Sequence, residues 1–138
     1  MPAARLTARQ GCRPDFLVLV HPVVTMGAAT HGGSRGNLSG AKPDAKLVAL
    51  FSDEAQVTAK TPPAFLAHAV NDKAVVPENS RAFRDALVAH KVSVKYLELP
   101  SGGHGLDGYQ GPMWDAWQAQ SLAWLAEMKF VPKPEAGR

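Results

Sequence analysis

Cysteine is nearly absent from this sequence of 138 residues, which contains Cys12 and no other. A single cysteine excludes a disulfide within the chain and a cluster of thiolates around a metal ion. The sequence also lacks an apolar run of membrane-spanning length, and its first twelve residues carry arginines without the apolar core of a signal peptide. The sequence therefore predicts no membrane segment and, as encoded, a cytoplasmic location.

Strong charge is the second feature that the sequence lacks. Its net charge is +3, charged residues make up 20% of the chain, and the lysines and arginines are scattered. This pattern gives no support to nucleic-acid binding. His31, His68 and His90 show no ligand spacing with one another or with acidic residues, so we expect neither a metal site nor a cofactor.

The residues that are present predict one globular α/β domain over 1–138. Hydrophobic residues make up 46% of the chain, which is enough to build a core at this length. Apolar runs predict strands, and apolar residues at helical spacing predict helices. The predicted strands cover 16–24, 65–70 and 92–99, and the predicted helices cover 43–51, 77–90 and 112–128. Residues 1–12 are predicted to be a weak helix or an N-terminal remnant of a helix, 25–40 a loop, 53–61 a polar connector and 132–138 a frayed tail.

The stretch from Thr61 to Gly105 contains a strand, a helix and a second strand, which together predict a βαβ unit. The two strands of such a unit pair in parallel. Asp72 follows the first of these strands, and His104 follows the second. Because parallel strands end at the same edge of a sheet, we expect both side chains at the edge where α/β proteins bind their ligands.

Asp72 and His104 are residue types that acid–base chemistry requires. Asp72 would accept a hydrogen bond from Nδ1 of His104, fix its tautomer and stabilise the imidazolium, which leaves Nε2 as a general base. Glycines around His104 allow the tight backbone that this requires. The alternative is a turn aspartate and a solvated loop histidine. Their matching positions after neighbouring strands favour the catalytic interpretation.

Four stretches of the sequence carry a resemblance to a known family: RPDF with LVLVHPVV, THGGSRGN, FSDEAQVTAKTPPAFLAHAVNDKAVVPENS and LPSGGHGL. Over 13–131 they resemble the C-terminal half of an α/β-hydrolase, most closely the acetylxylan and feruloyl esterases that are grouped with xylan-side-chain esterases. The resemblance implies a three-layer, partial α/β-hydrolase fold with a short, mostly parallel sheet. It also implies the order Ser, Asp, His, with the acid at Asp72 and the base at His104. It places the family's nucleophile elbow and oxyanion loop before Arg13, so we expect a truncated hydrolase domain.

The pentapeptide from Gly32 to Gly36 matches the pattern Gly-x-Ser-x-Gly, and its serine is Ser34. An elbow serine follows its strand directly and is followed directly by a helix. Ser34 instead comes ten residues after Val24, and the next predicted helix begins only at Pro43. Ser34 is thus the candidate nucleophile, beside the alternative of a coincidental pentapeptide in a glycine-rich loop.

Three further residues have structural interpretations. Ser101, three residues before His104, is a weaker nucleophile candidate that we expect to cap the backbone. His21 stands where the resembling family usually carries tyrosine, and we expect it to be a hydrogen-bonded core residue of the first strand. His68 is expected to be a structural residue of its strand.

Together these observations predict a carboxylic ester hydrolase that acts on small or short-chain esters through Ser34, His104 and Asp72. We expect its activity to be weak, because the resemblance leaves out the oxyanion loop and one lost donor costs about 2.7–4 kcal/mol. The alternative is a non-catalytic hydrolase fragment that acts as a structural or oligomerising module. The expected partners are a small ester and a second copy of the chain, which pairs through the edge strand 16–24.

Overall fold

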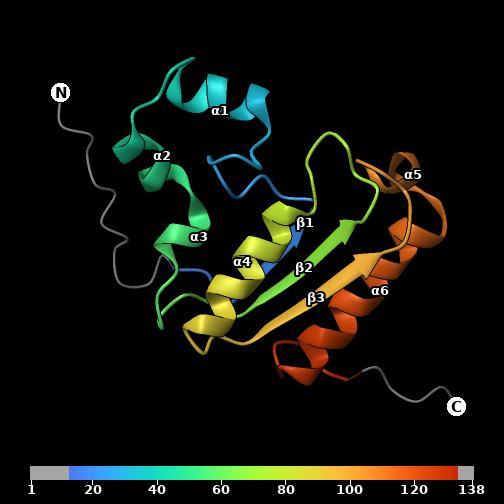
Figure 1. The fold of residues 1–138 in the computed structure, drawn as a ribbon. Coiled ribbons are helices and arrows are strands. Elements are labelled where there is room, and N and C mark those ends of the chain that lie inside the picture. Colours follow the sequence, from blue (N-terminus) through green and yellow to red (C-terminus); the bar gives the residue numbers. More distant parts are fainter. Residues whose placement is uncertain (1–12, 134–138) are drawn as a thin grey trace, which may run out of the picture.

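The computed structural model describes residues 13–133 of the chain. These residues form one three-stranded sheet, with α4 on one face and α6 on the other (Figure 1). The strands are β1 (Leu17–Val20), β2 (Ala64–Ala69) and β3 (Val94–Leu99). The helices are α1 (Gly32–Ser39), α2 (Ala45–Phe51), α3 (Asp53–Gln56), α4 (Glu78–Ala89), α5 (Leu106–Tyr109) and α6 (Gly111–Glu127).

The strands pair in parallel in the order β1-β2-β3, with Leu66 of β2 opposite Leu19 of β1 and Tyr96 of β3. This arrangement confirms the predicted βαβ unit, which consists of β2, α4 and β3. All three strands therefore end at one edge of the sheet, called here the C-terminal edge (Figure 1).

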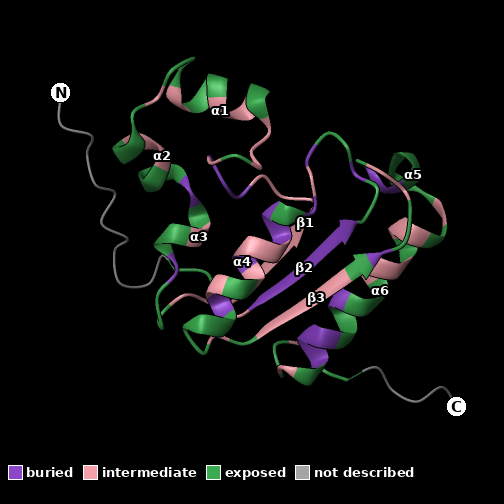
Figure 2. Cartoon of the chain, in the orientation of Figure 1, coloured by how far each residue is buried: buried purple, intermediate pink, exposed green. Residues whose placement is uncertain are grey.

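The central strand β2 is buried along its whole length (Figure 2). Its side chains alternate between the faces of the sheet. Leu66 packs with Phe83 and Leu87 of α4 on one face, and Phe65 packs with Trp124 of α6 on the other. Each fully buried side chain of this size contributes about 1.5–3 kcal/mol. The two helices hold the sheet between them, so the predicted three-layer α/β architecture is confirmed.

Proline marks the start of both covering helices. Pro77 is the N-cap of α4, and Pro112 lies in the first turn of α6. The first turn tolerates proline because its N–H groups have no partner within the helix. Trp117 and Trp124 of α6, with Met128 at its C-cap, pack against the sheet.

The predicted strand 16–24 is shorter in the structure, because β1 ends at Val20. His21 adopts a φ of 39°, which leaves the extended region and ends the strand. The following segment is held instead by the side chain of Asn79, whose Oδ1 accepts hydrogen bonds from the N–H groups of Val24 and Thr25 at 2.9 and 3.1 Å.

The predicted loop from Thr25 to Gly40 is wrong in its second half, where helix α1 forms. His31 is the N-cap of this helix, and its ring accepts from the backbone N–H of Ser34. Two glycines open the helix and give it low intrinsic propensity, which concealed it in the sequence. Leu50 of the predicted helix 43–51 is 54% exposed, so the apolar residues of α2 do not all face the core.

The weak helix predicted over 1–12 lies outside the described residues, and so do residues 134–138 of the predicted tail. Among the helices of 13–133, none combines the length and the hydrophobicity that a membrane crossing requires.

Candidate acid–base site

Asp72 lies in the turn that follows β2 and is buried, with 3% of its surface exposed. Its Oδ1 accepts hydrogen bonds from the backbone N–H groups of Ala74 and Val75 at 3.0 and 2.9 Å. A side chain that binds its own backbone in this way forms an Asx turn. The turn therefore fixes the carboxylate at the C-terminal edge of the sheet and leaves Oδ2 for other partners.

His104 lies in the loop between β3 and α5. Gly102, Gly103 and Gly105 around it have φ angles of 107°, 57° and 89°, in the left-handed region that glycine adopts at little cost. The N–H of Gly103 donates to Oδ1 of Asn71 at 3.0 Å, which ties this loop to the turn that carries Asp72. The predicted role of the glycines is confirmed, and the sequence analysis did not identify the contribution of Asn71.

The predicted contact between the two side chains is confirmed: Nδ1 of His104 lies 2.9 Å from Oδ2 of Asp72. An ionised carboxylate can only accept a hydrogen bond, so Nδ1 carries the proton and Nε2 of the neutral ring is an acceptor. The side chain of His104 is 40% exposed, and Nε2 has no hydrogen-bond partner within 13–133. In this geometry, Nε2 of His104 can accept a proton.

The charge of Asp72 is favoured by its hydrogen bonds. Burial raises its pKa, but the bonds from His104 and from the N–H groups of Val75 and Ala74 outweigh burial and hold the pKa below the ordinary 3.8. The carboxylate is therefore ionised at neutral pH and can stabilise an imidazolium at His104.

His68 is a second imidazole beside Asp72 and is fully buried in β2. Its Nε2 lies 2.8 Å from the carbonyl of Val75 and 3.3 Å from Oδ2 of Asp72, and its Nδ1 lies 2.7 Å from Oγ of Ser80. Both partners of Nε2 are acceptors, so Nε2 carries the proton and Nδ1 accepts from the serine hydroxyl. Burial lowers the pKa of His68 more than its polar neighbours raise it. A neutral His68 thus donates to the carbonyl of Val75, with its N–H beside the carboxylate of Asp72.

The expectation that His21 is a core residue within a strand is wrong. The residue follows β1 at the C-terminal edge and is half-buried, and its ring centroid lies 4.3 Å from that of His104. The signal that could have found it was Pro22, because a strand that ends before this proline places His21 at the same edge as Asp72 and His104.

Ser34 lies in the first turn of α1, and its Oγ is 2.9 Å from Nδ1 of His31. The hydrogen bonds of the described residues join Ser34 to His31 and not to His104. Ser34 also lines a cavity of about 480 Å³ together with Val23, Met26, Asn37 and Leu38. The structure therefore brings Asp72 and His104 together and gives Ser34 a separate partner. Its role as nucleophile stays a prediction, and Ser101 is exposed in the loop before His104.

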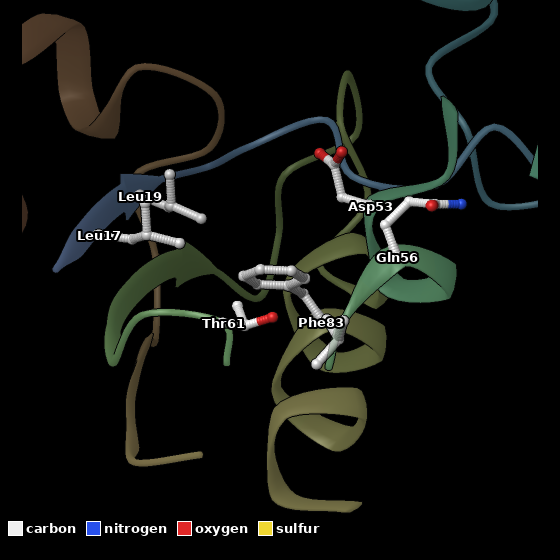
Figure 3. A pocket seen from close by; sticks show the side chains of 7 residues that line it. Leu17, Leu19, Asp53, Gln56, Thr61 and Phe83 are labelled. Carbon is white, nitrogen blue, oxygen red and sulfur yellow. The ribbon is translucent and has the colours of Figure 1, made fainter. Parts of the chain in front are cut away.

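A second cavity, of about 310 Å³, lies against one face of β1 (Figure 3). Leu17 and Leu19 of β1 face Phe83 of α4 there, beside Asp53 and Gln56 of α3. Its lining includes neither Asp72 nor His104. Within the described part of the chain, no three His, Cys, Asp or Glu side chains are placed to hold a metal ion.

A parallel sheet between helices, with an acid after one strand and a histidine after the next, matches the order of acid and histidine in α/β-hydrolases. The model of the prolyl oligopeptidase family matches residues 28–129, and the chain belongs to that family. The predicted resemblance to α/β-hydrolase esterases is confirmed by the solved structures described next.

The chain is similar to the acetyl ester-xyloside bifunctional hydrolase of Caldicellulosiruptor lactoaceticus, with 36% identity and a TM-score of 0.82 over 87% of this chain and 44% of that one. It is also similar to the carboxylesterase Cest-2923 of Lactobacillus plantarum, with 26% identity and a TM-score of 0.71 over 87% of this chain and 46% of that one. Endo-1,4-beta-xylanase B of Butyrivibrio fibrisolvens is 37% identical over 105 residues, which are 76% of this chain and 16% of that protein. The chain thus spans less than half the length of each of these relatives.

Proposed function

We propose that the chain is a carboxylic ester hydrolase for small esters, in which His104 is the general base and Asp72 orients it. One observation carries the proposal: Nδ1 of His104 lies 2.9 Å from Oδ2 of Asp72, while Nε2 has no partner within 13–133. The similarity to a carboxylesterase and to an acetyl ester-xyloside hydrolase supports this reaction class.

In the proposed reaction, a serine Oγ attacks the ester carbonyl carbon while Nε2 of His104 takes the hydroxyl proton. The electron pair of the carbonyl moves onto its oxygen as the new C–O bond forms. When the bond to the alcohol breaks, the imidazolium returns its proton to the leaving oxygen. Water then repeats the attack on the acyl-serine, and His104 again takes and returns the proton. Asp72 stabilises the charged ring in both halves.

We keep Ser34 as the proposed nucleophile. Its hydroxyl lies beside an imidazole, since Oγ is 2.9 Å from Nδ1 of His31, although Ser34 lies within the first turn of α1 and not directly after a strand as an elbow serine does. Attack assisted by His104 would require the segment that carries Ser34 to approach the loop after β3.

The test combines a fluorophosphonate probe, which labels activated serines, with hydrolysis of p-nitrophenyl acetate. If the proposal holds, the whole chain is labelled and turns over the ester. His104→Ala then removes most of the rate, and Asp72→Asn lowers it by orders of magnitude because the wrong tautomer is favoured. His90→Ala, at an exposed histidine after α4, is the matched control and should leave the rate unchanged.

Peptide mapping of the labelled chain tests the nucleophile separately. A label on Ser34, together with a loss of orders of magnitude in Ser34→Ala, supports its assignment. A label on another serine, or an equal rate in Ser34→Ala, moves the role to that serine or to a water activated by His104.

A second function is a non-catalytic hydrolase module whose role is structural or oligomerising. The observation that favours it is the engagement of Ser34 with His31 as part of the N-terminal cap of α1. A folded chain that shows no probe labelling and no ester turnover would support this second function over the first.

A further inference from the structure

His21 directly follows β1 and turns its backbone out of the strand with a φ of 39°. Its backbone N–H nevertheless donates to the carbonyl of Ala67 in β2 at 2.8 Å. The residue is therefore anchored to the sheet at the C-terminal edge while its backbone bends. Few residues other than glycine adopt this conformation, and here it directs an imidazole toward the proposed acid–base pair.

The ring of His21 contacts the ring of His104, with centroids 4.3 Å apart and planes inclined by 57°. Asp72 holds the same ring of His104 through Nδ1 at 2.9 Å. His104 is thus held by the carboxylate at Nδ1 and by contact with a second ring. A rotation of the His104 side chain would break both contacts.

The titratable groups that act on His21 are His104 after β3, Asp72 after β2 and His68 within β2. Burial lowers the pKa of His21 most, the charge of His104 lowers it further, and Asp72 raises it less. Two imidazoles in contact repel each other when both are charged. Asp72 accepts a hydrogen bond from His104 and not from His21.

We propose that His21 is a positioning residue for His104, whose ring it supports so that Nδ1 stays on Asp72 and Nε2 stays available. The inference rests on the proposed function, because it takes His104 as the base. The support requires a flat, uncharged ring at position 21. A phenyl ring at position 21 should provide the same support, whereas the methyl group of alanine should not.

The test observes the proton on Nδ1 of His104 by NMR of the whole chain with ¹⁵N-labelled histidine, so it does not require turnover. Exchange of this proton with water reports how often the bond to Asp72 opens. We expect His21→Ala to speed the exchange about two- to tenfold, which is the factor that one aromatic contact contributes. His21→Phe should restore the wild-type rate, and His90→Ala should not change it.

Equal exchange in wild type and in a folded His21→Ala would overturn the inference, as would a failure of His21→Phe to restore the slow rate. If His21→Ala does not fold, the inference is tested by the pH dependence of the Nδ1 proton exchange rate in wild type and in His21→Phe. As the pH falls, protonation of His21 beside His104 should add a rise in the wild-type exchange rate that His21→Phe lacks. Identical profiles would contradict the inference. An inactive wild type would contradict the proposed function and leave these NMR measurements valid.

Discussion

Three hydrogen-bond donors converge on the carboxylate of Asp72. The backbone N–H groups of Ala74 and Val75 bind Oδ1, and the ring of His104 binds Oδ2, while Nε2 of His68 lies 3.3 Å from the same oxygen. The two amides cannot gain charge, and the buried His68 is held neutral because burial lowers its pKa. His104, whose side chain is 40% exposed, is therefore the ring that Asp72 holds and that solvent can reach.

The neutral His68 predicts a dependence of stability on pH. Its pKa in the folded chain lies below the ordinary 6.5, so the unfolded chain binds this proton first as the pH falls. The stability that the neutral ring contributes is complete above pH 6.5 and is lost as the pH falls through the folded pKa. We expect the free energy of unfolding to decrease as the pH falls below 6.5, by up to about 1.4 kcal/mol per pH unit for each such group. His21 adds to the slope with the same sign.

Urea denaturation across this pH range measures the effect. His68→Gln should be less stable than the parent at neutral pH but should have a smaller slope below pH 6.5. The control His90→Gln should keep the slope of the parent. A slope that is unchanged in His68→Gln would contradict the assignment of this pH dependence to the ring of His68. The stabilising effect of Asp72 depends on a lower pH range. Because the pKa of Asp72 lies below the ordinary 3.8, this effect is lost only below about pH 3.8.

At the level of single residues, the sequence predicted Asp72 and His104 because each directly follows a strand of a βαβ unit. It could not predict His21 in the same way, since the apolar run continues to Val24 and conceals the end of β1. The contact of Asn71 with Gly103 was equally inaccessible, because it depends on how two loops approach each other and not on the spacing within either one.

The loop that carries His104 depends on glycine at defined positions. A Cβ atom at Gly102 would lie 3.1 Å from Cα of Leu106 and 3.4 Å from the side chain of Met113, at a φ of 107°. Gly102→Ala should therefore destabilise the chain by about 1–3 kcal/mol, the cost of one strained backbone conformation. It should also displace His104 from Asp72. Urea denaturation measures the first effect and the exchange of the Nδ1 proton measures the second.

Gly36→Ala is the matched control for this prediction. Gly36 lies within α1 and has no positive φ, and a Cβ atom added to it would meet no other atom within 4 Å. Alanine there should stabilise the helix by about 0.5–1 kcal/mol. If Gly102→Ala were as stable as Gly36→Ala, the loop would not depend on the conformation of Gly102.

At the level of elements, β2, α4, β3 and α6 were predictable because their apolar periodicity is long and proline marks where both helices start. Helix α1 was not, because it contains three glycines and has no buried residue to create a periodic pattern. Short helices of this kind are stabilised by caps and neighbouring segments rather than by their own composition. The histidine cap of α1 is outside the usual set of capping residues.

At the level of the whole molecule, the outer edge of β1 is one of the two edges of the described sheet, the other being that of β3. The backbone N–H of Leu17 donates to the carbonyl of Pro63, just before β2, at 2.9 Å, and that of His21 donates to Ala67 of β2 at 2.8 Å. Because donors alternate along a strand, those of Val18 and Val20 face the opposite side. Within 13–133 no strand pairs there. Leu17 and Leu19 also line the cavity of Figure 3, so apolar side chains and open backbone groups lie together at this edge.

An open edge with apolar side chains favours association with another strand. We therefore predict a homodimer in which β1 pairs with β1 of a second copy across a two-fold axis, so that the two sheets become continuous. Each large apolar side chain removed from water would contribute about 1.5–3 kcal/mol. Sedimentation velocity at micromolar concentration should show the dimer, and a compact monomer would contradict it.

A substitution in the backbone distinguishes edge pairing from other modes of association. Proline at position 18 removes an N–H that faces outward and that β2 does not use, and edge strands tolerate proline there. Val18→Pro should therefore remain folded and become monomeric, whereas Val18→Ala keeps the N–H and should remain dimeric. If Val18→Pro stays folded and still dimerises, the association uses another surface and β1 is not its interface. If Val18→Pro is monomeric while Val18→Ala dimerises, the hydrogen bonds of the open edge are what hold the two copies together.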